Sequence, residues 1–90
     1  MSNETNTRER LAEIDPTLLF ADGFDEAIIG IGVQWSKEGL VLYDRKKVVD
    51  KLMRDGMTYG EAEEFFEFNI QGAWLGERTP IFVTRLEDIE

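Results

Sequence analysis

Two helix-forming segments in the second half of the chain carry their own start and stop signals, and these constrain the fold most. The first segment, RKKVVDKLMRD, follows Asp44, whose carboxylate can cap the free N–H groups of a first helical turn. Gly56 ends it where a left-handed residue commonly closes a helix. Thr58 and Glu61 then form a capping box ahead of the second segment, YGEAEEFFEFNIQ. The sequence therefore predicts two consecutive helices joined by a short turn.

Apolar side chains at helical spacing predict which face of each helix is buried. In the first helix this set is Val48, Val49, Leu52 and Met53. In the second it is a stripe of Tyr59, Ala62, Phe66 and Ile70, widened by Phe65 and Phe68. Glu63, Glu64 and Glu67 occupy the other side of the second helix. We expect Phe66 and Leu52 to be buried on facing helices.

Two apolar runs, at 26–35 and 40–44, are separated by the turn SKEG and predict a β-hairpin with Gly39 in the left-handed conformation. Strict alternation places on one face the side chains of Ile29, Ile31, Val33, Trp35, Leu40 and Leu42. The opposite face then carries Ile28, Gly30, Gly32, Gln34, Val41 and Tyr43. A third strand is predicted within TPIFVTRL, at residues 79–86.

A short helix is also expected ahead of Pro16, since the residue before a proline avoids the helical region. The predicted order is helix, two strands, two helices and strand. This order indicates an α+β fold, with a small antiparallel or mixed three-stranded sheet and two helices packed on one face. We expect residues 1–17 to form an N-terminal helical extension and residues 18–90 to form a single α+β domain.

The chain contains neither cysteine nor histidine, which removes several kinds of chemistry. The commonest zinc ligands, the usual general base and the thiol nucleophile are all missing. The carboxylates of DGFDE do not have the ligand spacing of a calcium-binding loop. We therefore predict no catalytic residue, no metal site and no cofactor, and we expect that the protein is not an enzyme.

A formal net charge of −9 disfavours direct binding to nucleic acids and to anionic membranes, because like charges repel. No run of about 18 apolar residues is present, so no membrane span is predicted. The first ten residues, MSNETNTRER, are polar and lack the apolar core of a secretion signal. These features predict a cytoplasmic protein.

Two stretches, LLFADGFDEAIIGIG and VLYDRKKVVDKLMRDGMTYGEAEEFFEFNIQGAWLGERTPIFV, carry a resemblance to a known family. Together they resemble a family of small acidic uncharacterised proteins of tailed phages and prophages. The similarity covers roughly residues 18 to 83 and is most specific from Tyr43 to Phe82. It implies a phage or prophage setting and the α+β arrangement, and it implies no activity and no functional residues.

Asn69 lies within an apolar stretch of the second helix, seven residues before the start of the loop GERTP, and it has two possible interpretations. In the structural interpretation, the amide faces inward and forms hydrogen bonds with backbone groups at the end of the helix, before the chain continues to the last strand. Trp74 and Leu75 are then expected to return to the core. In the functional interpretation, it belongs to a ligand site in which Arg78 takes a phosphate. The members of that candidate site are Tyr43, Asp44, Asn69, Glu77, Arg78 and Thr79.

Two functions from different classes follow from these observations. The first is a non-enzymatic protein that binds a host or phage protein through an acidic surface, with Glu63, Glu64 and Glu67 as candidate contacts. A DNA mimic or a factor directed against host defences would be one version of it. The alternative is a protein that binds a small molecule or nucleotide signal in a pocket near Asn69 and Arg78. The sequence leaves self-association open.

Overall fold

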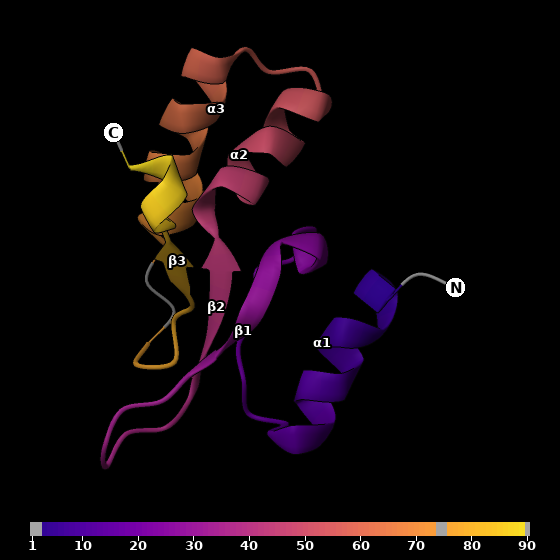
Figure 1. The fold of residues 1–90 in the computed structure, drawn as a ribbon, viewed down its shortest axis with the longest axis vertical. Helices are drawn as coiled ribbons and strands as arrows, with labels where there is room; N and C mark the ends of the chain where they lie inside the picture. The colour runs from indigo at the N-terminus through magenta and orange to yellow at the C-terminus, as the bar shows by residue number, and fades with distance from the viewer. Residues whose placement is uncertain (1–2, 74–75, 90) are drawn as a thin grey trace.

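The structure is a computed structural model that describes residues 3–73 and 76–89. Helix α1 (Asn3–Ile14) leads through a connector to the short helical turn η1 (Asp25–Ala27) and to a hairpin of strands β1 (Ile28–Gly32) and β2 (Leu40–Asp44). The second half of the chain contains α2 (Arg45–Arg54), α3 (Tyr59–Phe65), η2 (Phe66–Gln71), β3 (Ile81–Val83) and η3 (Leu86–Asp88). The α+β class and the predicted order of elements are confirmed (Figure 1).

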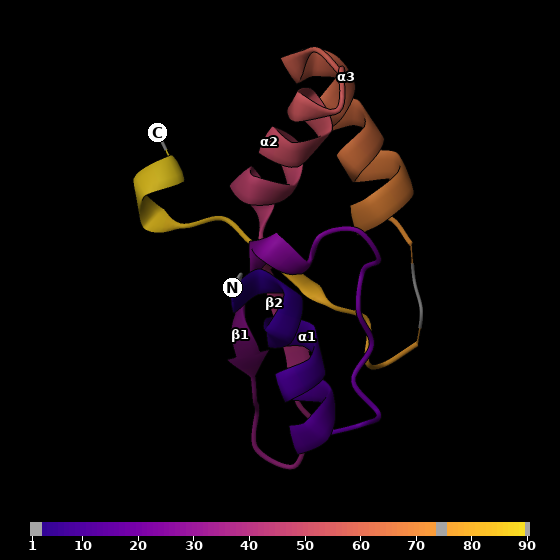
Figure 2. The same ribbon diagram turned by 90° about the vertical axis from the view of Figure 1, so that its right-hand side faces the viewer.

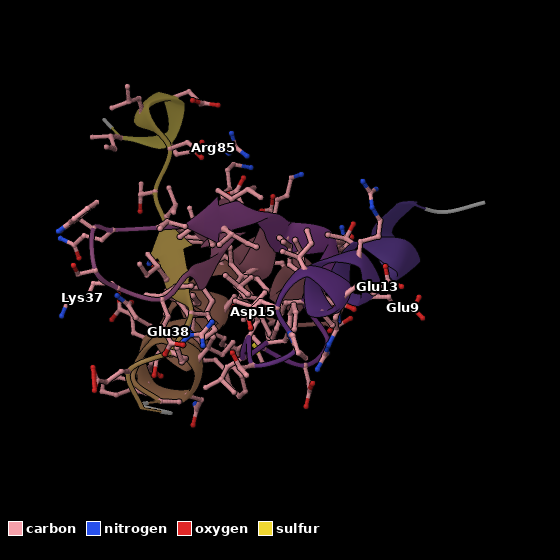
Figure 3. All side chains as sticks on the ribbon, turned by 90° about the horizontal axis from the view of Figure 1, so that it is seen from below. Glu9, Glu13, Asp15, Lys37, Glu38 and Arg85 are labelled. Carbon is pink, nitrogen blue, oxygen red and sulfur yellow. The ribbon has the colours of Figure 1, made fainter. Side chains whose placement is uncertain are left out.

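The three strands form a mixed sheet in the order β1-β2-β3. Strands β1 and β2 are antiparallel, whereas β2 and β3 are parallel, with Leu42 opposite Ile81 and Tyr43 opposite Phe82. Helices α2 and α3 stand beyond the end of β2, and α1 lies beside the hairpin (Figures 1 and 2). Viewed from below, α1 and the α3–η2 segment lie on the same side of the sheet (Figure 3). The opposite face, which carries Leu42 and Ile81, is more open.

The capping interactions predicted for the starts of α2 and α3 are formed. Asp44 accepts a bond of 3.0 Å from the backbone N–H of Lys46 at the start of α2. Thr58 and Glu61 complete the capping box of α3, with the Thr58 hydroxyl accepting from the Glu61 backbone N–H and the Glu61 carboxylate accepting from that of Thr58. Gly56 follows α2 with a φ of 115°. These local predictions are confirmed.

The core lies between the sheet and the helices on its covered face. Its buried apolar residues are Leu18, Ala27, Val41, Tyr43, Val48, Val49, Leu52, Ala62 and Phe66. The predicted burial of Phe66 and Leu52 is confirmed, whereas Met53 is 38% exposed. The ring of Phe66 meets that of Phe82 edge-on at 5.2 Å, and the ring of Tyr43 stacks with that of Phe82 at 5.5 Å. This aromatic trio joins η2 to both of the strands that it covers.

The predicted alternation of faces in the first strand is wrong, because β1 contains a bulge between Ile28 and Gly30. Ile28 pairs with Tyr43 and Ile31 with Val41, so both isoleucines turn toward the core. The extra residue in β1 reverses the side-chain alternation after it. Gly30 accommodates the bulge with a φ of 152°.

The hairpin turn also differs from the prediction. The left-handed residue is Ser36, with a φ of 62°, and Gly39 does not have a positive φ. Gly39 is instead required for space, because a Cβ there would lie 2.8 Å from the Ile31 side chain. Strand β1 ends at Gly32, so Trp35 lies in the exposed loop. Trp74 and Leu75, expected to return to the core, lie outside the described residues.

Candidate functional site

Two of the six candidate ligand residues, Tyr43 and Asp44, have structural roles in the interior. The Tyr43 ring is fully buried, and its hydroxyl accepts a hydrogen bond of 2.7 Å from the backbone N–H of Ala21. Burial raises the pKa of this phenol, against the smaller opposing effect of the Ala21 bond. The hydroxyl therefore fixes the connector between α1 and β1 onto the end of β2.

Asp44 is the one charged residue found buried in the described part of the chain. In addition to capping α2, it accepts a hydrogen bond of 2.7 Å from Nε of Arg85. Burial alone would raise the pKa of Asp44, but the bonds from Arg85 and from the backbone of Lys47 and Lys46 outweigh it and lower the pKa. Asp44 is therefore ionised and already paired. The sequence analysis did not identify Arg85 as its partner.

Arg78 is occupied by contacts within the protein. Its guanidinium donates to the backbone carbonyl of Gly39 at 3.0 Å, to the Thr17 hydroxyl at 2.7 Å and to the Asp15 carboxylate at 2.8 Å. The carboxylate of Glu38 lies 3.3 Å away, and the Arg78 side chain is only 14% exposed. These contacts use most of the donors of the guanidinium and so disfavour the predicted phosphate contact.

The six candidates do not form one site. Glu77 and Arg78 line a hollow beside the hairpin loop, whereas Asn69 and Thr79 line a separate cleft. The Thr79 hydroxyl donates to the backbone carbonyl of Gly76 at 2.6 Å and closes the turn between them. Asn69 is exposed, and its side chain makes no hydrogen bond to another described residue. The prediction of an inward-facing amide at the end of the helix is therefore wrong.

A change in helix type places Asn69 at the surface. The predicted single helix is α-helical from Tyr59 to Phe65 and continues as a π-helix from Phe66 to Gln71. A π-helical turn takes more residues per rotation than an α-helical one, so side chains beyond Phe66 are displaced from the α-helical stripe. Asn69, which an α-helix would place near the buried stripe, moves away from it. Such segments occur frequently at functional sites.

Two aromatic residues that the sequence analysis assigned to the buried stripe are also exposed. Phe65 is 38% exposed and Phe68 is 75% exposed, so their assignment to the buried stripe is wrong. Both line a surface hollow of about 340 Å³. We call it the aromatic–acidic groove, and its lining residues are Met57, Glu61, Glu64, Phe65, Phe68 and Asn69. The available signal was the crowding of apolar side chains at 65, 66, 68 and 70, which one helix face cannot bury together.

The three candidate glutamates have different surroundings. Glu63 forms a two-point ion pair with Arg45, at 2.6 and 3.1 Å, and the hydrogen bond from Arg45 lowers its pKa. Glu67 lies 3.8 Å from the same guanidinium, which also stacks over the Phe66 ring. Glu64 lines the aromatic–acidic groove. Glu64 is therefore the candidate best placed to meet a partner, together with Glu61, which the sequence analysis did not select.

A second hollow, of about 280 Å³, lies on the other side of Asn69. Its lining comes from the connector (Phe20, Ala21, Asp22 and Phe24), from η2 and the residue after it (Asn69, Ile70 and Ala73), and from the start of the last strand (Thr79, Pro80 and Phe82). We call this hollow the connector cleft. Asn69 contributes to both hollows and so forms the ridge between them.

The described residues show no group of three or more carboxylates placed to hold a metal ion. The acids of DGFDE face arginines instead: Arg8 contacts Asp22 and Asp25, and Arg54 contacts Glu26. Within residues 3–73 and 76–89, none of the helices combines the length and apolar character that crossing a membrane requires.

Comparisons with family models, with curated proteins and with solved structures give no significant match to this chain.

Proposed function

We propose that the protein is a non-enzymatic binding module whose aromatic–acidic groove docks a basic segment of a protein partner. The observation that carries this proposal is the exposure of Phe68 and Phe65 beside Glu61 and Glu64. Large aromatic side chains that remain exposed to solvent in the folded protein are typical anchors of protein interfaces. Carboxylates at the rim of such an anchor select partners by charge and speed their encounter.

The chemistry of the groove specifies the partner. An apolar side chain would fill the space between Phe65, Phe68 and Met57, and lysine or arginine on either side of it would meet Glu61 and Glu64. The net charge of −9 attracts such a segment from a distance and repels nucleic acids. We assign the partner to a host or phage protein and the setting to the cytoplasm, on the resemblance of residues 18 to 83 and on the composition.

The proposal is tested by capturing partners from host lysate and measuring the affinity of each purified partner for matched variants. Phe68→Ala should weaken binding at least tenfold, because anchor residues contribute disproportionately to binding energy. Leu86→Ala is the control, since Leu86 is also exposed and apolar but belongs to η3. A partner that loses affinity equally for both variants, or for neither, contradicts docking in the groove.

The contribution of charge is measured separately. Glu64→Lys should slow association, and binding should weaken as salt shortens the screening length below about 8 Å. Glu13→Lys, an exposed position on α1, is the matched control. Salt-sensitive binding that does not respond to Phe68→Ala would favour the DNA-mimic version, in which charge alone makes the contact.

A further inference from the structure

The connector cleft has rigid apolar walls. Phe20, Phe24, Ile70 and Phe82 line it, and each of these side chains also packs against the buried core. Phe82 also contacts two buried rings of the core, those of Tyr43 and Phe66. Side chains that are packed against the core cannot move to fill the cleft, so the cleft is present without a ligand.

The dimensions of the cleft limit its ligand. Its volume of about 280 Å³ is just below what small-molecule sites usually provide, about 300–1,000 Å³. A single aromatic ring with one substituent suits this space, whereas a nucleotide does not. The nucleotide version of the alternative function is therefore disfavoured by size, and also by the commitment of Arg78 to Asp15, Thr17 and Gly39.

The polar groups at the rim limit the charge of the ligand. Asp22 is paired with Arg8 at 2.9 Å, which offsets part of its charge. The guanidinium of Arg8 also stacks over the Phe20 ring and is thereby held at the connector. Asn69 offers both an N–H donor and a carbonyl acceptor, and neither is used by another described residue. A neutral ligand with its own donor and acceptor matches this rim.

We propose that the connector cleft binds a small neutral aromatic molecule whose carboxamide-like edge pairs with the amide of Asn69. The ring would lie against Phe82, Ile70 and the connector phenylalanines. The two amides would exchange hydrogen bonds at the rim. This proposal is independent of the aromatic–acidic groove, which lies on the other side of Asn69.

Benzamide is the probe, titrated into the ¹⁵N-labelled protein and followed by two-dimensional NMR. We expect saturable shifts in the Asn69 side-chain amide and in the backbone signals of Ile70, Ala73 and Phe82, with a dissociation constant in the millimolar range. Benzoate should bind more weakly, because it adds a negative charge to an acidic protein. Toluene should bind more weakly because it lacks the amide. The absence of saturable shifts up to 20 mM benzamide would overturn the proposal.

Three variants locate the site. Ala73→Leu fills the cleft and should abolish binding, whereas Gln71→Leu adds the same side chain outside the lining and should change affinity less than twofold. Asn69→Ala should weaken binding about threefold to tenfold, the range expected for lost neutral hydrogen bonds. Preserved dispersion of the spectrum establishes that each variant is folded.

Phe68→Ala separates this proposal from the proposed function. It should leave benzamide binding intact while it removes docking of a protein partner. Loss of benzamide binding in this variant, together with shifts confined to Glu61, Glu64 and Phe65, would place the probe in the groove and overturn the cleft assignment.

Discussion

The carboxylate of Asp15 and the guanidinium of Arg78 lie 63 residues apart in the chain and are joined by a hydrogen bond of 2.8 Å. Asp15 follows α1, and Arg78 precedes β3. Because Arg78 also bonds Thr17 and the carbonyl of Gly39, one side chain connects the end of the first helix, the hairpin and the last loop. These three segments meet at the hairpin end of the sheet, where Asp15 and Glu38 are seen from below (Figure 3).

Replacing Arg78 with alanine should lower the free energy of unfolding by about 2–3 kcal/mol, because several charge-assisted hydrogen bonds are lost together. Arg78→Lys should recover little of this loss, since an ammonium cannot reproduce the planar set of donors. Denaturant midpoints provide the measurement, with the exposed Arg10→Ala as control. Equal midpoints for Arg78→Ala and Arg10→Ala would show that the junction contributes nothing.

The Asp15 carboxylate should titrate well below its ordinary range. Hydrogen bonds from the Thr17 hydroxyl and backbone N–H, followed by those from Arg78, lower the pKa of Asp15 from 3.8 to about 2. Because the folded-state pKa is depressed, its contribution to stability is present above pH 3.8 and is lost as the pH falls toward 2. Carbon-detected NMR of the carboxyl group checks the midpoint.

Asp15→Asn isolates this contribution from the other acids. The variant should be less stable than the parent protein near pH 6, and the difference should shrink as the pH falls through the window between the two pKa values. A difference that stays constant from pH 6 to pH 2 would contradict the assignment.

The substitution Phe→Ala can be compared at Phe66 and Phe68, two positions that differ in burial. Phe66→Ala should cost about 3–5 kcal/mol, because its ring is fully buried against Phe82. Phe68→Ala should change stability by less than about 0.5 kcal/mol, because the side chain is mostly exposed. Thermal or denaturant unfolding of the pair tests the assigned burial, since two buried rings would give two large losses.

Asn69→Leu should leave stability within about 0.5 kcal/mol of the parent protein, the usual range for surface substitutions. This expectation replaces the loss of about 1–3 kcal/mol that an inward-facing amide would have produced. A large drop in the denaturant midpoint would show that the amide supports the end of the helix after all.

Two glycines with open space around them should respond oppositely to alanine. Nothing lies within 4 Å of a Cβ at Gly30 or Gly60, so neither substitution creates a clash. Gly30→Ala should destabilise by about 1–3 kcal/mol, because the bulge holds a φ of 152° there. Gly60→Ala should stabilise by about 0.5–1 kcal/mol, since alanine favours the helix. Paired unfolding curves decide both outcomes.

The features of the fold that could be predicted are those whose causes lie within a few residues of each other. Asp44 bonds the second residue after it, Thr58 and Glu61 bond across three positions, and Gly56 closes a helix in its own immediate neighbourhood. Hydrogen bonds of this range form in the same way wherever the segment is placed. The order of helices and strands could therefore be predicted from residue patterns alone.

The candidate site was predicted only in part, because its members depend on partners far along the chain. Asn69 and Thr79 do share a cleft, but Arg78 is taken by Asp15 and Gly39, and Asp44 by Arg85. No spacing in the sequence shows which of several carboxylates an arginine will meet. The internal partners of Arg78, which disfavour the phosphate-binding role assigned to it, could therefore not be predicted.

The sequence by itself determined the helix boundaries at Asp44, Gly56 and Thr58, and the succession of helices and strands. Only the tertiary structure decided which side chains in the apolar segments are buried. The bulge after Ile28 and the π-helical turn after Phe65 each change the direction of the side chains that follow. Such shifts are selected by the packing of distant elements, so that Ile31 and Phe66 pack in the core while Asn69 faces outward.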